Sequence, residues 1–330
     1  MNKIITILFL CFFILQAEDE YELGKGVQVA SLPLYVGGYF SADYAQSKAV
    51  TTYRLNDIAL LAYGTFEKLS YMAEVEYKDF YTHSQYPNSY SITKDRDLHV
   101  ERLYFDYIYN ENFAVTLGKY NSPIGLWNLL PVNALRQTIF NPMTSDIIFP
   151  NYTTGAVVSY STYSDYGLKI GVIYQNNDDF DDNYNNYKLD QHYGLNVVYE
   201  KDDYTLKLDG GYFHQTNAFD DTEFLHYALL SGKYDSDKFQ FSTELGYQQG
   251  QREITSLAGY VQGLYRFTEQ HIGSIRVESY DDRLSADVGQ LAVFTYTYRP
   301  LFPIAIKSEY ELNSHDLQDK LMFSLMRVIF

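Results

Sequence analysis

Histidine, serine and cysteine, the side chains that most often act as bases and nucleophiles, lack the spacing that such chemistry needs. Seven histidines are scattered along the chain, and no H-E-x-x-H, G-x-S-x-G, phosphate-loop or dinucleotide motif is present. The single cysteine, Cys11, lies inside an N-terminal apolar run. We therefore predict no catalytic residue, no cofactor and no thiolate metal site.

An acidic segment, residues 176–190, collects oxygen ligands that suit a divalent cation. Its acidic residues are Asp178, Asp179, Asp181, Asp182 and Asp190, and asparagines lie between them. The fixed ligand spacing of a calcium-binding loop is missing. Two interpretations therefore stay open, a divalent-cation site and a solvated acidic loop.

Charged side chains also recur at alternate positions within segments whose other positions are apolar. Seven basic and eight acidic residues share this parity: Arg102, Lys169, Lys207, Arg266, Arg276, Lys307 and Arg327, and Glu74, Glu76, Asp106, Asp209, Glu244, Glu278, Glu309 and Glu311. Opposed rows of charge across a water-filled lumen produce a transverse field that admits small polar solutes. The alternative is that these are solvated side chains with local ion pairs, each of which contributes little.

Strands position these charges. The chain contains 35 Tyr and 21 Phe but one Trp, and its mean hydropathy is −0.29. Apolar residues alternate with polar ones, as Phe113, Val115 and Leu117 do, and aromatics gather at the ends of such runs. Strands that turn one face to lipid and the other to water explain this pattern. A soluble sandwich also alternates, but it does not require tyrosines at its strand ends.

Sixteen segments have this character, which predicts an all-β fold, a transmembrane antiparallel β-barrel of about 16 strands. They are residues 32–43, 53–66, 70–80, 98–109, 113–121, 152–162, 166–175, 191–200, 204–215, 223–234, 238–248, 255–267, 270–281, 287–299, 302–313 and 320–330. Strand boundaries are uncertain by a few residues, so 14 to 18 strands remain compatible with the sequence.

The connections alternate between short and long. Tight polar turns such as 110–112 and 201–203 suit the periplasmic side, whereas 81–97, 122–151 and 176–190 suit extracellular loops. An even strand number then places both termini in the periplasm. The sequence predicts an integral protein of the outer membrane of a Gram-negative bacterium, in contact with outer-membrane lipid and lipopolysaccharide.

The two ends of the chain support this location. Residues 1–17 have the pattern of a cleaved signal peptide, residues 18–31 form a periplasmic lead-in, and residues 32–330 form the barrel. Phe330 closes an amphipathic last strand and is the predicted signal for the barrel-assembly machinery. Loss of one lysine with the signal peptide changes the net charge from −17 to −18, which argues against a nucleic-acid partner.

Residues 122–151 form the longest segment without alternation. This segment holds four of the eight prolines and the only tryptophan, together with many aliphatic residues. A long apolar loop needs a surface to pack on. We expect it to fold into the lumen as a constriction loop, with pore-constriction candidates Lys119, Trp127, Arg136 and Asp146. An extracellular flap over the barrel mouth is the alternative.

The residues that enter this loop carry a family resemblance. Gly118-Lys119-Tyr120-Asn121-Ser122-Pro123-Ile124-Gly125-Leu126 resembles a Gly-basic-aromatic-x-x-Pro-aromatic-Gly stretch of the phosphate-selective porin-like family of Gram-negative bacteria, with Ile124 where Phe is more frequent. The resemblance implies a barrel, a constriction loop and a homotrimer. Phosphate transport in that family depends on many lumenal arginines and lysines, which this acidic chain does not offer.

Together these observations predict an outer-membrane porin that gives passive diffusion of ions and small hydrophilic solutes, and not an enzyme. A weakly selective pore with a slight cation preference is expected because wall charges nearly balance and the mouth is acidic. Two alternatives stay open: a barrel enzyme of the lipase or protease type, for which His83, His99, His214 and His226 are available, and a non-conducting adhesin barrel. The sequence does not identify the physiological solute.

Overall fold

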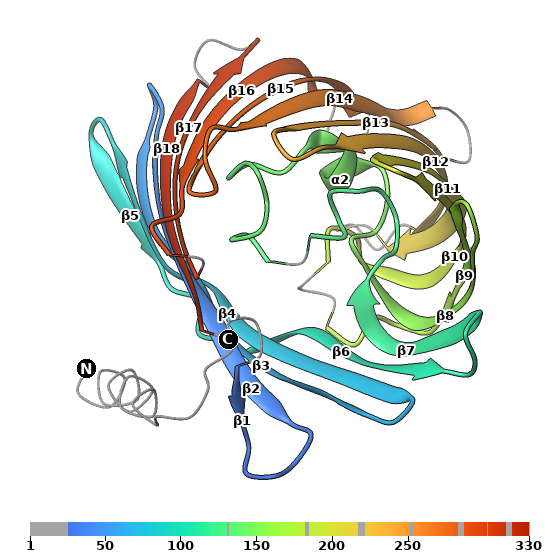
Figure 1. Cartoon of the computed structure of the whole chain (residues 1–330). Coiled ribbons are helices and arrows are strands. Elements are labelled where there is room, and N and C mark those ends of the chain that lie inside the picture. Colours follow the sequence, from blue (N-terminus) through green and yellow to red (C-terminus); the bar gives the residue numbers. More distant parts are fainter. Residues whose placement is uncertain are drawn as a thin grey trace.

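Sixteen antiparallel strands close into a barrel in the computed structural model of the chain (Figure 1). The structure describes residues 26–130, 132–181, 185–216, 222–250, 254–282, 287–301, 303–314 and 319–329. The predicted signal peptide, residues 18–25 of the lead-in, Asp182 and Phe330 lie outside these residues. The predicted fold class, an all-β antiparallel barrel of about 16 strands, is confirmed.

Neighbours in the chain are neighbours in the ring. The strands are β2 Tyr35–Gln46, β3 Thr51–Phe66, β4 Leu69–Tyr86, β6 His99–Ile108, β7 Phe113–Asn121, β8 Tyr152–Tyr163, β9 Gly167–Asn176, β10 Leu189–Lys201, β11 Tyr204–Thr216, β12 Thr222–Asp235, β13 Phe239–Gln249, β14 Ile254–Arg266, β15 His271–Asp282, β16 Asp287–Tyr298, β17 Ile304–Asn313 and β18 Lys320–Ile329. Pairing of β18 with β2, with Met326 opposite Ser41, closes the ring. Such closure leaves no free sheet edge in the ring.

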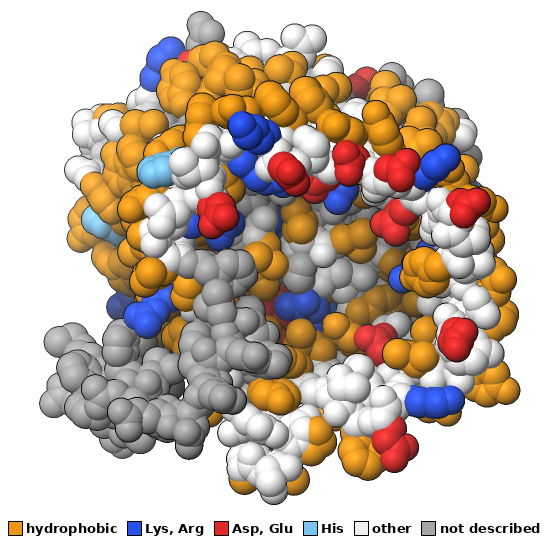
Figure 2. Space-filling model, in the orientation of Figure 1, with side chains coloured by type: hydrophobic (Ala, Val, Ile, Leu, Met, Phe, Trp, Pro, Cys, Tyr) orange, Lys and Arg blue, Asp and Glu red, His pale blue; other side chains and the backbone are white. Residues whose placement is uncertain are grey.

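The two faces of each strand differ as alternation predicts. In β13, Phe239, Phe241 and Leu245 are exposed on the outside, whereas Ser242 and Glu244 are buried on the inside. Figure 2 shows hydrophobic side chains over the outer wall and charged side chains around the central opening. Apolar residues therefore face the lipid, and polar residues face the interior.

Aromatic pairs mark both ends of the outer face. Near the short turns, the ring centroids of Phe113 and Tyr160 are 5.0 Å apart. Near the long connections, those of Tyr174 and Tyr193 are 5.3 Å apart, and Tyr193 also stacks on Tyr212. Amphipathic rings at two levels are the girdles expected at the two membrane interfaces.

One predicted connection contains strand structure. Residues 81–97 were expected as a loop, but β4 continues to Tyr86 and returns as the short strand β5 (Ser89–Thr93). A second short strand, β1 (Val27–Gln28), pairs with β2. In β5, Tyr90 and Ile92 alternate with Ser89, Ser91 and Thr93, and all five side chains are exposed. With only two apolar residues, this alternation is too short to predict a strand from the sequence.

The placement of Arg327 in the lumen is wrong. Arg327 lies opposite Phe40 on β2 and Ile304 on β17, both on the outer face, whereas its neighbours Met326 and Val328 are buried inside. The prediction assigned Met326 and Val328 to lipid because they are apolar. Here the interior of β18 is itself apolar, because it packs against residues of the long connection.

That connection, residues 122–151, is called the long loop below. It contains the short helix α2 (Met143–Ile147), and Figure 1 shows α2 and its flanking segments within the ring of strands. Apart from this helix, the long loop has no regular structure. No helix in the described part of the chain is long and apolar enough to cross a membrane.

Candidate functional site

Acidic side chains of the barrel wall bind the main chain of the long loop. The carboxylate of Glu309 on β17 accepts hydrogen bonds from the N–H groups of Ile139 (2.7 Å) and Phe140 (2.9 Å). Glu278 on β15 accepts one from Met143 N–H at 2.9 Å, and Asp209 on β11 accepts one from Gly125 N–H at 2.9 Å. Hydrogen bonds to a charged acceptor are stronger than neutral ones.

Glu244 on β13 accepts three hydrogen bonds from the long loop. It accepts hydrogen bonds from the N–H groups of Leu126 and Trp127 and, at 2.9 Å, from the Thr144 hydroxyl. A loop outside regular structure must satisfy its backbone donors in some way. Here the wall carboxylates satisfy them.

Basic wall side chains bind the loop's carbonyl groups in the same manner. Lys207 Nζ donates to Pro123 O (2.8 Å) and Gly125 O (2.7 Å). Lys307 Nζ donates to the carbonyl groups of Asn133 and Arg136, and Arg276 donates to that of Phe140. These lysines and arginines lie inside the barrel, as their parity predicts, but they lie beneath the loop. They are anchors of the loop and do not face open solvent.

Apolar packing joins the same surfaces. Ile147, Ile148 and Phe149 of the long loop pack into a cluster with inward-facing Phe213 and Leu225, and all five are at most 8% exposed. Burial of such side chains stabilises the docked loop by about 1.5–3 kcal/mol for each. The loop therefore rests on the β11–β17 wall through polar and apolar contacts together.

Two glycines of the Gly118–Leu126 stretch have backbone conformations that other residues rarely adopt. Gly118 on β7 has φ +124°, and a Cβ there would lie 2.2 Å from Leu103 O. Gly125 has φ +67°, and a Cβ there would lie 2.8 Å from the Glu244 carboxylate. Glycine at these positions thus lets the chain leave the wall and reach its anchors.

A polar cavity of about 390 Å³ lies on the opposite side of the loop, against β2, β3, β4 and β6. Its lining contains three basic side chains, four acidic ones and seven asparagines: Arg54, Lys78 and Arg136; Asp57, Asp79, Glu101 and Asp146; and Asn56, Asn128, Asn133, Asn141, Asn151, Asn185 and Asn186. Tyr39, Tyr152, Ile139 and Phe140 complete it. We call this space the polar cavity.

Most of the wall residues of the polar cavity were missed from the sequence. Pairing registers shift at Leu55/Asp57 between β3 and β4, and at Glu74/Val75 between β4 and β6. Such irregularities put consecutive side chains on one face, which strict alternation assigns to opposite faces. Adjacent polar residues within a strand, as in Glu101-Arg102, were the available signal.

Of the four constriction candidates, two line the polar cavity. Arg136 donates from Nη1 to Asn133 Oδ1 at 2.7 Å and to Asn141 Oδ1 at 3.1 Å. Asp146 lies on α2, and burial raises the pKa of its carboxyl to about 6. The structure places these two side chains on the loop face that borders the polar cavity.

The other two candidates, Lys119 and Trp127, lie elsewhere. Lys119 is 1% exposed and lies 3.3 Å from the Asp179 carboxylate. Trp127 is 3% exposed, and the Arg276 guanidinium lies 5.4 Å from its ring centre. Neither residue lines the polar cavity. Trp127 instead lines a second cavity of about 420 Å³ between the long loop and strands β10–β14. The assignment of Lys119 and Trp127 to the pore constriction stays a prediction. Both were chosen for position along the chain, which does not reveal the direction of a side chain.

Two residues of the acidic segment 176–190 are engaged with the wall. Asp179 accepts a hydrogen bond from Thr154, and Asp181 accepts one from Val100 N–H at 2.9 Å. Asp181 also lies 3.4 Å from His99. These two carboxylates therefore belong to side-chain and backbone contacts and not to a fully solvated loop.

Four further predicted wall charges, Asp106, Lys169, Arg266 and Glu311, lie inside the barrel but away from the polar cavity. Asp106 accepts a hydrogen bond from Thr116. Arg266 pairs with Asp235 at 3.0 Å near a short turn, and Glu311 lies 3.8 Å from Lys320. Lys169 has inward parity on β9 and is exposed. Asp106, Arg266 and Glu311 therefore make local contacts of the kind that the simpler interpretation of the sequence describes.

Among the four histidines available to an enzyme, His214 makes the shortest contact with a carboxylate in the described part of the chain. His214 Nδ1 lies 2.7 Å from Asp190 Oδ1, and its ring packs on Phe224. A catalytic triad also needs a nucleophile beside the imidazole. Among the described residues, no hydrogen bond joins His214 to a serine. The pair therefore lacks the third member of such a site in the part of the chain described.

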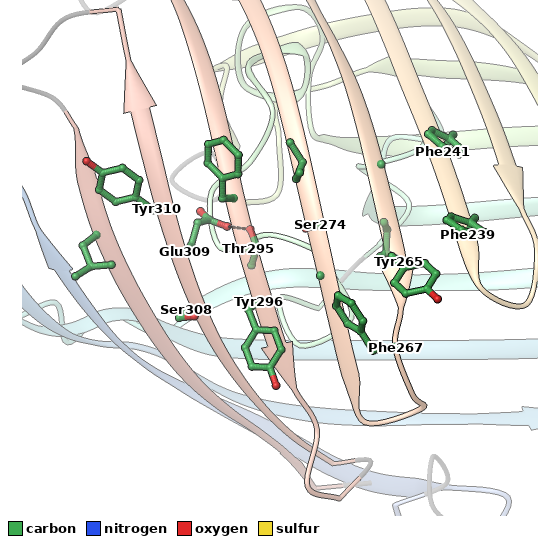
Figure 3. A pocket seen from close by; sticks show the side chains of 16 residues that line it. Phe239, Phe241, Tyr265, Phe267, Ser274, Thr295, Tyr296, Ser308, Glu309 and Tyr310 are labelled. Carbon is green, nitrogen blue, oxygen red and sulfur yellow. Dashed lines mark hydrogen bonds between the residues drawn. The ribbon is translucent and has the colours of Figure 1, made fainter.

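An apolar groove of about 570 Å³ lies on the outer face between β13 and β18. Figure 3 shows Phe239, Phe241, Tyr265, Phe267, Tyr296 and Tyr310 along it. Gly263 and Gly273 contribute no side chain there, which leaves space between the rings. An outward apolar surface suits lipid and offers nothing to a hydrophilic solute.

Solved structures share this architecture, although no family model and no curated protein matches the sequence. OmpF of Salmonella typhi, in complex with daunomycin, has a TM-score of 0.61 at 11% identity, over 89% of this chain and 97% of that chain. An anion-selective porin from Comamonas acidovorans has a TM-score of 0.61 at 10% identity, over 89% and 99%. The trimer form of OmpT, an outer membrane protein of Vibrio cholerae, has 0.58 at 12%, over 89% and 98%. At these identities the comparison establishes one property, that this chain has the fold of outer-membrane porins.

Proposed function

We propose that this chain is an outer-membrane porin in which small hydrophilic solutes and ions diffuse through the polar cavity. The observation that carries the proposal is the asymmetry of the long loop. One side is bound to the β11–β17 wall and leaves a cavity of about 420 Å³ with both polar and apolar lining beside Trp127, whereas the other borders a cavity lined mainly by charges and amides. A loop fixed in this way narrows a lumen without filling it. The porin fold supports the same function.

Selectivity follows from the lining of the polar cavity. Three basic and four acidic side chains nearly cancel, so we propose a weakly selective pore with a slight cation preference. Arg54 pairs with Asp79 at 3.4 Å, which further reduces the free charge. Amide groups both donate and accept hydrogen bonds, so they replace part of the hydration shell of a polar solute. The wall charges beneath the loop contribute little because they are bound to its backbone.

We also propose an assembly and an orientation in the membrane. A homotrimer is favoured by the resemblance of the Gly118–Leu126 stretch and by the trimer form of OmpT. The outer-membrane fold supports a location in the outer membrane with contacts to lipopolysaccharide, and the short turns support periplasmic termini. The role of Phe330 in assembly rests on the sequence alone.

Site-directed modification in planar bilayers tests the pore. The mature chain has no cysteine if residues 1–17 are removed, so single cysteines report single positions. In the variant Asn56→Cys, a charged methanethiosulfonate reagent is expected to reduce single-channel conductance, because Asn56 lines the polar cavity. The matched control is Leu60→Cys on the same strand, which is 55% exposed on the outer face. Its modification should leave conductance unchanged.

Two results would contradict the proposal. Folded protein that produces no conductance steps is not a porin, and the adhesin alternative would then gain support. Conductance that is insensitive to modification at position 56 would place the pathway elsewhere. An equal reduction of conductance in the Leu60→Cys control would show that the effect does not depend on which face of β3 carries the cysteine.

A further inference from the structure

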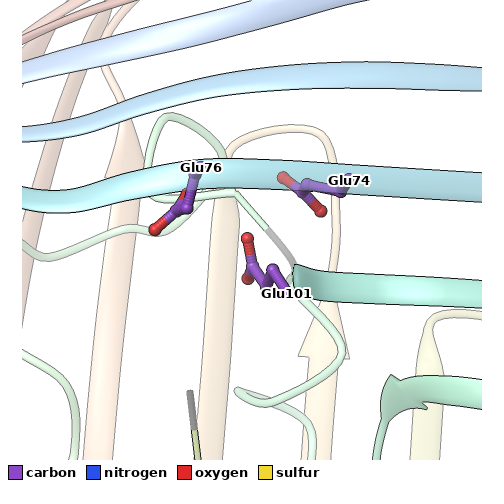
Figure 4. A group of neighbouring side chains, drawn as sticks. All are labelled: Glu74, Glu76 and Glu101. Carbon is purple, nitrogen blue, oxygen red and sulfur yellow. The ribbon is translucent and has the colours of Figure 1, made fainter. Parts of the chain in front are cut away.

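Three glutamates converge in the wall next to the polar cavity. Glu74 and Glu76 lie on β4, and Glu101 lies on β6 (Figure 4). One carboxylate oxygen from each lies within 4.8 Å of the others. Glu74 and Glu76 are 0% exposed and Glu101 is 3% exposed. The register shift at Glu74/Val75 turns Glu101 inward beside Arg102, and this brings the third carboxylate to the group.

The donors around this group leave one oxygen unsatisfied. Arg102 pairs with Glu74, and Tyr39 O–H lies 2.8 Å from Glu76 and 3.2 Å from Glu101. Tyr152 O–H donates to the other oxygen of Glu101. Glu74 Oε1 is buried and has no hydrogen-bond partner. A buried carboxylate oxygen without a donor costs free energy, and a bound cation removes that cost.

Glu244 shows what a satisfied carboxylate looks like in the same barrel. Its two oxygens receive donors from Leu126, Trp127 and Thr144. No other carboxylate stands close enough to make a cluster of three with it among the described residues. The glutamate group on β4 and β6 differs in both respects, because its acids face one another and one oxygen remains open.

We propose that Glu74, Glu76 and Glu101 bind one Ca²⁺ ion in the pore wall. Calcium takes oxygen ligands at about 2.3–2.6 Å, so ligands on opposite sides of the ion are separated by about 4.6–5.2 Å. In the group, one oxygen from each carboxylate lies no more than 4.8 Å from the others, so one Ca²⁺ ion can contact all three. Magnesium keeps several of its water ligands and usually binds through one or two carboxylates, so three protein carboxylates suit calcium better.

The polar cavity gives this site an entrance. Glu101 lines the cavity, so an ion reaches the group from the lumen, and water from the same space completes a shell of about 6–8 ligands. The bound ion joins β4 to β6 and adds two positive charges beside the pathway. Calcium at the site therefore reduces the cation preference of the pore.

Terbium luminescence measures the binding directly. Tb³⁺ substitutes for Ca²⁺, and Tyr39 and Tyr152 lie close enough to the carboxylates to transfer excitation to it. Folded protein in detergent is titrated with Tb³⁺ and then with Ca²⁺ or Mg²⁺. We expect one saturable site per chain, displaced by Ca²⁺ at least tenfold more readily than by Mg²⁺. Absence of such a site in the wild type overturns the proposal.

Isosteric variants locate the site. Glu74→Gln and Glu101→Gln are each expected to weaken Tb³⁺ binding at least tenfold. The matched control is Glu311→Gln, because Glu311 is 1% exposed and also has an unpartnered oxygen but belongs to no cluster of three carboxylates among the described residues. Binding that survives in both Glu74→Gln and Glu101→Gln, or that is lost equally in Glu311→Gln, overturns the assignment. The carboxylates would then be held together by shared protons.

Reversal potentials provide the second readout. Millimolar Ca²⁺ should shift the wild-type potential toward anions more than Mg²⁺ at the same ionic strength, and Glu101→Gln should remove the difference. Equal shifts with both ions indicate general screening and count against the site. The detergent titration does not require conduction, so failure of the porin proposal and failure of the calcium site are distinguished.

Discussion

Replacement of Glu309 by glutamine tests whether wall carboxylates hold the long loop in place. Glu309 accepts two consecutive N–H groups, from Ile139 and Phe140, and also the Thr295 hydroxyl at 2.6 Å. A glutamine amide has one acceptor oxygen, and its NH₂ group faces a donor instead of accepting from it. One of the two N–H groups is therefore left without a partner.

The size of the effect follows from these contacts. An unsatisfied buried N–H costs about 1–3 kcal/mol, and loss of charge from the remaining hydrogen bond costs about 1 kcal/mol more. The sum is about 2–4 kcal/mol in favour of local opening of the loop. At about 1.4 kcal/mol per factor of ten, the open population rises roughly 30- to 700-fold.

Hydrogen exchange measures this population at the affected amides. In the folded protein, peptides that cover residues 137–142 should lose protection by that factor in Glu309→Gln, because exchange there reports local opening. Single-channel current noise should increase as well, because Ile139 and Phe140 line the polar cavity. The control is Glu311→Gln, two residues further on the same inner face, which pairs with Lys320. Unchanged protection in Glu309→Gln, or an equal loss in the control, would refute the anchoring argument.

Two further predictions concern the pore side of the loop and its entry. Because burial raises the pKa of Asp146 to about 6, this carboxyl takes up a proton as the bath is acidified from pH 7.5 to pH 5, and the zero-current potential should shift toward anions with a midpoint near pH 6. Asp146→Asn should show a potential shifted toward anions already at pH 7.5 and a smaller titration, because another carboxyl, that of Asp57, lines the same cavity. Asp237→Asn, in a short turn, should keep the full titration, and an unaltered titration in Asp146→Asn would assign it to another group. Gly125→Ala introduces a Cβ at φ +67° and 2.8 Å from the Glu244 carboxylate, which costs about 1–3 kcal/mol and should reduce exchange protection of residues 124–128 roughly 5- to 140-fold. In Gly210→Ala the nearest atom is 3.6 Å away, so protection there should persist, and equal behaviour of the two variants would contradict the conformational requirement at Gly125.

The barrel was predictable because alternation in a membrane has one physical cause. Each strand has a lipid face and an inner face, so residues such as Phe241 and Glu244 reveal their positions by type alone. Lys207, Arg276 and Glu309 lie buried on the inner face, where their alternation with apolar residues places them. Arg327 shows the limit of this reasoning, because an apolar interior under the loop reverses the usual contrast on β18.

The lining of the polar cavity was not predictable in the same way. Register shifts break the period of two where β3, β4 and β6 border the cavity, so Asn56, Asp57 and Glu101 were not selected. The role of the inner charges also depends on the path of the loop, which alternation does not describe. Alternation places Glu244 on the inner face whether its carboxylate faces water or accepts a hydrogen bond from Leu126. The path of the long loop decides between these two roles.

The anchoring of the long loop through its main chain separates attachment from specificity. Every residue except proline carries an N–H group, and every residue carries a carbonyl, so Glu309 and Lys307 bind the loop with little regard for its side chains. Side chains on the opposite face, such as Asn141 and Asp146, are then free to change. If the proposed function holds, mutation can alter the preferred solute while the barrel and the docked loop persist, and the barrel is then a suitable scaffold for new selectivities.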